Sequence, residues 1–254
     1  ADISINGDLR WSLPLFSRKV SQSSVDFTAR QADWRITVLD MNQSHPFATR
    51  HMAHAVSPQV LFEEVSRRTD EDAFIVTDVG QHQMWTAQFF PVQRPRHFIS
   101  SGGLGTMGFG LPAAMGAKVA CPDKQIILFT GDGSIMMNCQ EFATLHKYRI
   151  DVKVIVVHNN VLGMVNQWQR MFYDGHYSQS VIRDNPDLPT LTKAMGVPGS
   201  SVREPAELPA ALDTLLAVSG PALLDVFIPE DDNVYPMVPG GKRLDDKVLG
   251  GVDA

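Results

Sequence analysis

Four short apolar runs constrain the fold of this sequence more than any other feature. They lie at 73–77, 125–130, 152–157 and 221–228, and stretches with helical spacing of apolar residues separate them. Strands that are apolar on both faces are typical of a parallel sheet that helices cover on both sides. We therefore predict an α/β domain over residues 56–230, built as a doubly wound parallel sheet with helices on both faces.

Local signals place the remaining elements around this sheet. Ser57 and Pro58 suit the N-cap and first position of a helix. A Gly-rich loop and helix are expected at 101–120, further helices at about 138–148, 163–173, 188–195 and 208–219, and a short strand near 200. Residues 1–30, with an apolar turn at 13–16, are expected to form a domain edge, 31–55 a linker and 231–254 an irregular C-terminal tail.

Composition excludes several classes of function. The chain has 254 residues, 44% of them hydrophobic, and a net charge of −6, which leaves no positive field for a nucleic acid. Cys121 and Cys139 lack metal-ligand spacing. The sequence has no apolar run long enough to span a membrane, so we expect a cytoplasmic protein, or a plastid or mitochondrial one if a leader has been removed.

Polar residues follow two of the predicted strands where each strand ends. Gly131-Asp132-Gly133-Ser134 follows the run at 125–130, and His158-Asn159-Asn160 follows the run at 152–157. Carboxyl ends of parallel strands meet at one edge, and Mg²⁺ prefers carboxylate, carbonyl and phosphate oxygens. GDG alone equally suits a plain turn, but the two strand ends together predict a Mg²⁺ and diphosphate site.

This pair of strand ends resembles the thiamine diphosphate motif, GDG followed by NN, with 25 residues between GDG and Asn159. In that family a Gly lies four positions beyond the ligating Asn, as Gly163 does here beyond Asn159. The resemblance implies that Asp132, Asn159 and the carbonyl of Val161 hold Mg²⁺, with His158 in place of the first family Asn. Ligation by Asn160 instead would leave the loop to Gly163 one residue short.

Backbone amides at two helix starts are expected to bind the diphosphate. One set is Gly133 and Ser134, whose hydroxyl could also contribute, and the other is Gly163, Met164 and Val165. The competing interpretation is a dinucleotide site at 103–110, GLGTMGFG. That segment lacks both a long preceding strand and the expected acidic residue, which disfavours a nicotinamide cofactor.

Four segments narrow the resemblance to the C-terminal half of the acetolactate (acetohydroxyacid) synthase catalytic large subunit. They are GQHQMW at 80–85, SSGGLGTMGFGLPAAMGAK at 100–118, GDGSIMMNCQEF at 131–142 and LGMVNQWQRMFY at 162–173. The resemblance implies that Val79, Gly80, Gln81 and His82 contact the diphosphate from a loop, that Gly105 and Met107 hold the pyrimidine end, that Leu162 adds to the cofactor site, and that Met164 and Trp168 line the substrate pocket.

The activity that the resemblance implies depends on thiamine diphosphate and Mg²⁺. Pyruvate is decarboxylated and its two-carbon unit joins a second 2-ketoacid, pyruvate or 2-ketobutyrate, in branched-chain amino acid biosynthesis. FAD, a homodimer or tetramer and a regulatory small subunit are expected for the complete subunit, of whose central domain residues 1–30 would be a remnant. The activating Glu would lie in a separate domain, so this chain is expected to be nearly inactive alone. Alternatives are another thiamine diphosphate 2-ketoacid decarboxylase or carboligase, or a non-catalytic cofactor-binding module.

Overall fold

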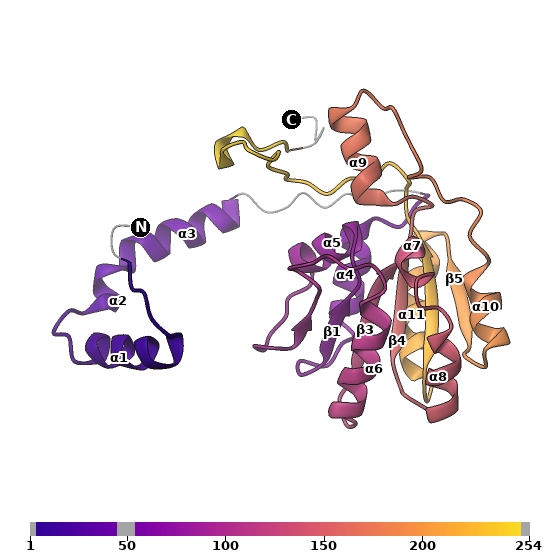
Figure 1. Ribbon diagram of the computed structural model, residues 1–254, viewed down its shortest axis with the longest axis horizontal. Helices are drawn as coiled ribbons and strands as arrows, with labels where there is room; N and C mark the ends of the chain where they lie inside the picture. Colours follow the sequence, from indigo (N-terminus) through magenta and orange to yellow (C-terminus); the bar gives the residue numbers. More distant parts are fainter. Residues whose placement is uncertain (1–3, 45–53, 250–254) are drawn as a thin grey trace. The chain divides into compact units, whose positions relative to one another are not determined.

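The computed structural model describes residues 4–44 and 54–249, which fall into two compact units, 1–48 and 49–254 (Figure 1). The first unit consists of α1 (Leu9–Ser21), α2 (Phe27–Arg30) and α3 (Ala32–Ser44), and none of its described residues is buried. Asp8 begins α1 by accepting the N–H of Arg10. The prediction of a turn at 13–16 is wrong, because these residues lie inside α1. The helix α3 occupies much of the segment that was expected to be a linker.

The second unit contains a six-stranded sheet in which every pairing is parallel. The strand order is β2-β1-β3-β4-β6-β5. The strands are β1 (Phe74–Thr77), β2 (Phe98–Ile99), β3 (Ile126–Gly131), β4 (Lys153–His158), β5 (Gly199–Val202) and β6 (Ala222–Phe227). β3 and β4 are buried along their whole length, as apolar runs predict, and the doubly wound fold is confirmed.

Helices cover both faces of the sheet (Figure 1). α4 (Pro58–Ser66), α5 (Gln81–Phe89) and α11 (Leu208–Ala217) pack into one apolar cluster, where the Phe62 and Phe129 rings lie 4.7 Å apart. α6 (Gly110–Ala120), α8 (Glu141–Tyr148) and α10 (Leu188–Ala194) pack into the cluster on the other face. Each large side chain buried there stabilises the sheet by about 1.5–3 kcal/mol.

Two helices begin at the carboxyl edge of the sheet, α7 (Asp132–Ile135) directly after β3 and α9 (Gly163–Phe172) shortly after β4. The short 3-10 helices η1 (Pro205–Glu207) and η2 (Leu244–Asp246) complete the described elements. Gln81 and His82 were expected in a loop, but they form the first turn of α5. Among the described residues, no helix is long and apolar enough to cross a membrane.

Candidate cofactor-binding site

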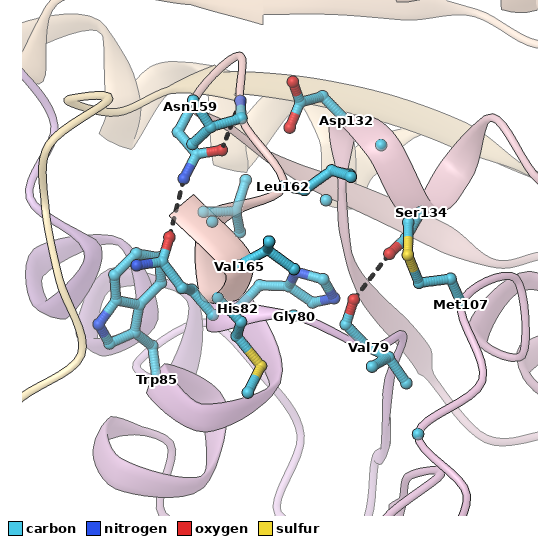
Figure 2. Close-up of a pocket in the computed structure, with 18 residues that line it drawn as sticks. Val79, Gly80, His82, Trp85, Met107, Asp132, Ser134, Asn159, Leu162 and Val165 are labelled. Atoms are coloured by element: carbon cyan, nitrogen blue, oxygen red, sulfur yellow. Dashed lines mark hydrogen bonds between the residues drawn. The ribbon is translucent and has the colours of Figure 1, made fainter. Parts of the chain in front are cut away.

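A pocket of about 230 Å³ lies at the carboxyl edge of the sheet, where the segments after β1, β3 and β4 converge (Figure 2). Trp85 and Val157 line it together with every residue that the sequence predicted to contact the cofactor. Those residues are Val79, Gly80, Gln81, His82, Gly105, Met107, Gly131, Asp132, Gly133, Ser134, Asn159, Val161, Leu162, Gly163, Met164 and Val165.

Sheet topology explains why the pocket forms here. β1 lies between β2 and β3. The chain leaves β1 through α5 on one face and reaches β3 from α6 on the other face. Because these connections diverge, a crevice opens beyond the carboxyl ends of the two strands, which is where ligands bind in such sheets.

Asp132 is the carboxylate at the end of β3, and only 1% of its surface is exposed. Its Oδ2 accepts the backbone N–H of Asn160 at 3.0 Å, which joins the segment after β3 to the segment after β4. Burial raises the pKa of Asp132 to about 6, although the charge of His158 acts against this rise. A buried carboxylate of this kind is stabilised by a cation.

Asn159 and Asn160 face different surroundings. Asn159 lines the pocket; its Oδ1 accepts the N–H of Val161 at 3.3 Å and its Nδ2 donates to Gln81 Oε1 at 3.0 Å (Figure 2). Asn160 has a left-handed φ of 61°, and its Oδ1 lies 3.0 Å from His158 Nε2. Of the two amides, the geometry presents that of Asn159 to the pocket.

Val161 forms an isolated antiparallel bridge with Val181. The backbone hydrogen bonds of this bridge use the neighbours of Val161: Ile182 N–H donates to the Asn160 carbonyl, and Leu162 N–H donates to the Ser180 carbonyl. The bridge therefore fixes the loop without using the carbonyl of Val161.

His158 forms a buried cluster that sequence reasoning missed. Its Nδ1 lies 3.0 Å from Asp225 Oδ1, and its ring stacks on Phe227 with 4.1 Å between centroids. Burial tends to lower the pKa of His158, but hydrogen bonding and charge from Asp225 outweigh it, with Asp132 adding to them, and the pKa is raised. The available signal was one carboxylate, Asp225, inside the apolar run at 221–228.

His82 carries the most informative polar atom of the pocket. It is 4% exposed, and burial lowers its pKa to about 3, so the ring is neutral at physiological pH. Among the described residues its Nε2 has no hydrogen-bond partner. A Cβ on Gly80 would lie 2.9 Å from this ring and one on Gly131 would lie 3.1 Å from it, so both glycines make room for it. A buried ring nitrogen without a partner indicates a ligand that supplies one.

The N-termini of α7 and α9 both lie at the pocket. Ser134 Oγ donates to the Val79 carbonyl at 2.8 Å, so its hydroxyl holds the end of β1 (Figure 2). Neither α7 nor α9 has a side-chain hydrogen bond at its N-cap within the described residues. The first N–H groups of α9, at Gly163, Met164 and Val165, therefore begin at the pocket without a side-chain cap.

Asp78 is a second buried carboxylate that sequence reasoning missed. It accepts the N–H groups of Gly108 at 2.9 Å and Gly110 at 3.1 Å, and burial raises its pKa. These bonds fix the segment that carries Gly105 and Met107 against the end of β1. The sequence signal was an acidic residue directly after an apolar strand.

Trp168 does not line the pocket. Its side chain is 53% exposed and lines a second pocket with Val165, Phe172 and Tyr173. Within residues 4–44 and 54–249, no group of three His, Cys, Asp or Glu could hold a metal ion. A cation at this pocket would thus be bound by one carboxylate together with amide and carbonyl oxygens, a set that suits Mg²⁺.

Comparison with known proteins assigns the domain. The family model for the C-terminal TPP binding domain of thiamine pyrophosphate enzymes matches residues 78–226, which contain the whole pocket. The chain belongs to the thiamine pyrophosphate enzyme family. The pocket is therefore in the domain by which this family binds the diphosphate cofactor.

Curated relatives confirm the narrower resemblance. The chain is 41% identical to the acetolactate synthase isozyme 2 large subunit of Escherichia coli over 95% of its length, and 37% identical to the chloroplastic acetolactate synthase of Arabidopsis thaliana over 98%. It spans 42% and 38% of those two proteins. A solved thiamine diphosphate-dependent 4-hydroxybenzoylformate decarboxylase from Rhodococcus jostii RHA1 superposes with a TM-score of 0.66 at 26% identity, over 73% of this chain and 35% of that one.

Proposed function

We propose that this chain supplies the Mg²⁺ and diphosphate half of the active site of an acetolactate synthase catalytic subunit. One observation carries the proposal: Asp132 and Asn159, from neighbouring strand ends, line one pocket with a buried His82 whose Nε2 lacks a partner among the described residues. The similarity of nearly the whole chain to acetolactate synthases supports this particular activity.

Mg²⁺ would be held by the Asp132 carboxylate, the Asn159 amide oxygen and the Val161 carbonyl. The residues fit the ion because all three groups are hard oxygen donors that meet at the pocket. The raised pKa of Asp132 supports the assignment, since a nearby cation favours the charged form of a buried carboxylate. Water and the diphosphate would complete the six oxygens that Mg²⁺ requires.

The diphosphate would be bound by the N–H groups of Gly133 and of the first turn of α9. The His82 ring has a hydrogen bond to the backbone of Asp78, and because Nε2 has no partner within the described residues, this bond uses Nδ1. The single N–H of the neutral ring therefore lies at Nδ1, and Nε2 would accept a hydrogen bond from the cofactor or from a water bound with it. Gly105 and Met107, on the segment that Asp78 anchors, would hold the pyrimidine end. The pocket volume of about 230 Å³ is below the roughly 300–1,000 Å³ of sites that enclose a whole ligand, which supports a half-site.

The chain's own residues would bind and orient, while thiamine diphosphate supplies the electron sink for decarboxylation of a 2-ketoacid. Met164 lies in the pocket and Trp168 beside it, so both are proposed to contact the 2-ketoacid acceptor. Our proposal for the complete protein includes an activating Glu, FAD, a homodimer or tetramer and a regulatory small subunit. It also divides this chain into a central-domain remnant at 1–30, a linker at 31–55 and a tail at 231–254.

Calorimetry with thiamine diphosphate and MgCl₂ tests the site. We expect wild-type binding to require Mg²⁺ and to be lost in Asn159→Gly. Asn160→Gly is the matched control, because glycine tolerates its left-handed φ of 61° and its side chain is directed to His158. Loss of binding in Asn160→Gly with full binding in Asn159→Gly would reverse the ligand assignment, and no binding by wild type would refute the proposed function.

A simple 2-ketoacid decarboxylase is the second candidate, because the superposed Rhodococcus protein bears that activity in its name. Its 26% identity is well below the 41% shared with an acetolactate synthase, which favours the first candidate. Product analysis of the complete protein separates them: the decarboxylase releases an aldehyde, whereas the synthase forms a branched 2-hydroxy-3-ketoacid.

A further inference from the structure

We propose that Gln81 and Gln167 form an amide relay that turns the oxygen of Asn159 toward the cation and makes the segment at 232–234 part of the metal site. The inference rests on the proposed function, because it assigns Asn159 as a Mg²⁺ ligand. The relay connects α5, α9 and the segment that follows β4 to the chain beyond β6. Four separate parts of the sequence therefore meet in it.

The relay begins at a backbone group whose polarity is fixed. Val234 N–H donates to Gln167 Oε1 at 2.9 Å, and Gln167 Nε2 donates to the Val234 carbonyl at 3.1 Å. A backbone N–H can only donate and a carbonyl can only accept, so the amide of Gln167 has one orientation. The usual ambiguity between the oxygen and nitrogen of a side-chain amide is thereby removed.

Gln81 transmits this orientation to the metal ligand. Its Nε2 donates to Gln167 Oε1 and to the Asp232 carbonyl, each at 3.0 Å. Gln81 Oε1 is therefore directed to the opposite side, where it accepts from Asn159 Nδ2 at 3.0 Å (Figure 2). Asn159 Oδ1 is then directed away from Gln81, toward the N–H of Val161 and the pocket.

Burial of the three amides makes any other orientation of their oxygen and nitrogen atoms costly. Gln81, Gln167 and Asn159 are 4%, 3% and 5% exposed, so water does not replace a lost partner readily. Reversing any one amide would place two oxygens or two NH₂ groups against each other and leave buried groups unpaired. Both amide hydrogens of Gln81 are also in use, so we assign Gln81 as a positioning residue of the metal site in preference to a donor to the diphosphate.

The experiment replaces Gln167 with methionine, which has a similar length but cannot orient Gln81. Gln88→Met is the matched control, because Gln88 Nε2 also ties α5 to the chain beyond β6, donating to the Tyr235 carbonyl at 3.2 Å. Within the described residues, no hydrogen bond joins the Gln88 side chain to Gln81, Gln167 or Asn159. Calorimetric titrations with thiamine diphosphate at graded MgCl₂ concentrations give the Mg²⁺ concentration for half-maximal binding. NMR hydrogen exchange of the Asn159 side-chain amide reports its hydrogen bond to Gln81 without any ligand.

We expect Gln167→Met to raise the half-maximal Mg²⁺ concentration by about 10-fold or more, as is typical when the partner of a metal ligand is lost. The Asn159 amide should exchange faster in Gln167→Met, and Gln88→Met should leave both readouts unchanged. Unchanged Mg²⁺ dependence and unchanged exchange in Gln167→Met would overturn the relay. If wild type bound no cofactor, the proposed function would fail and the exchange measurement alone would decide whether the relay exists.

Discussion

Gly163→Ala is expected to disrupt the site although it adds a single methyl group. A Cβ at this position would lie 1.9 Å from Gln81 Oε1, 2.6 Å from Gln81 Cδ and 3.1 Å from Asn159 Nδ2. These distances are shorter than van der Waals contacts, so the amide of Gln81 must move. That amide is buried and held by three hydrogen bonds, to Asn159, Gln167 and the Asp232 carbonyl.

The size of the effect follows from those bonds. Each contributes a net of about 1 kcal/mol, so their loss costs about 3 kcal/mol. The lower backbone entropy of unfolded alanine offsets about 0.5–1 kcal/mol of this. The remaining cost of about 2–2.5 kcal/mol corresponds to a fall in melting temperature of about 4–10 °C for a unit of this size.

Thermal unfolding followed by circular dichroism measures this fall, and calorimetry should show loss of thiamine diphosphate binding in the same variant. Gly116→Ala is the control: Gly116 lies inside α6 with open space around its Cβ position, so alanine there should raise stability by about 0.5–1 kcal/mol. If Gly163→Ala and wild type had equal melting temperatures and equal binding, the close packing of Gly163 against the Gln81 amide would be wrong.

Three further predictions address single side chains. The pKa of Asp132 is raised from 3.8 to about 6, so its protonated form stabilises the cofactor-free fold below about pH 4, and this contribution is lost as the pH rises through about 6. The unfolding free energy of wild type relative to Asp132→Asn should therefore fall by about 2–3 kcal/mol between these pH limits, and a flat difference would contradict the assignment. Asp78→Ala should lower stability by about 2–4 kcal/mol and expose the segment at 101–109 to protease, since it removes the acceptor of the Gly108 and Gly110 N–H groups; urea unfolding and limited proteolysis measure this, and wild-type behaviour in both would count against the anchor. Trp168→Ala should change stability by less than about 1 kcal/mol because the side chain is 53% exposed, yet alter the preference between 2-ketobutyrate and pyruvate in competition assays of the complete protein, where an unchanged ratio would exclude the acceptor role.

Strand positions could be predicted because a parallel sheet that is covered on both faces imposes a strong pattern. Every position of β3 and β4 is buried, so each run is apolar except where a partner exists for a polar group. Lys153 is one such exception, with its ammonium donating to the carbonyls of Val218 and Gly220. The edge strand β2 has two half-buried residues and gives no comparable pattern.

Helix α5 could not be predicted because its sequence lacks amphipathic spacing. The buried face of α5 includes the polar residues Gln81 and His82, which line the pocket. Apolar residues at helical spacing therefore do not mark this face in the sequence. The helices of residues 9–44 were missed for other reasons: Pro14 lies inside α1, and the apolar residues of α3 show no regular helical spacing.

The pocket could be located because its residues follow strand ends, where few positions are available. The proposed metal ligands, Asp132 and Asn159, could be named from the resemblance and from the spacing to Gly163. The residues that hydrogen-bond to the pocket residues could not be predicted. Gln167, Asp225 and the Val234 backbone come from distant parts of the chain, and only the fold brings them to the pocket. No local pattern marks such partners.

A crystal structure of the chain with thiamine diphosphate and MgCl₂ would show which groups bind the cation and where the diphosphate lies. We predict one cation about 2.0–2.1 Å from an Asp132 carboxylate oxygen, Asn159 Oδ1 and the Val161 carbonyl oxygen. Asn159 Nδ2 should keep its hydrogen bond to Gln81 Oε1. A cation bound without Asp132 and Asn159, or a diphosphate outside the pocket that these residues line, would contradict the account.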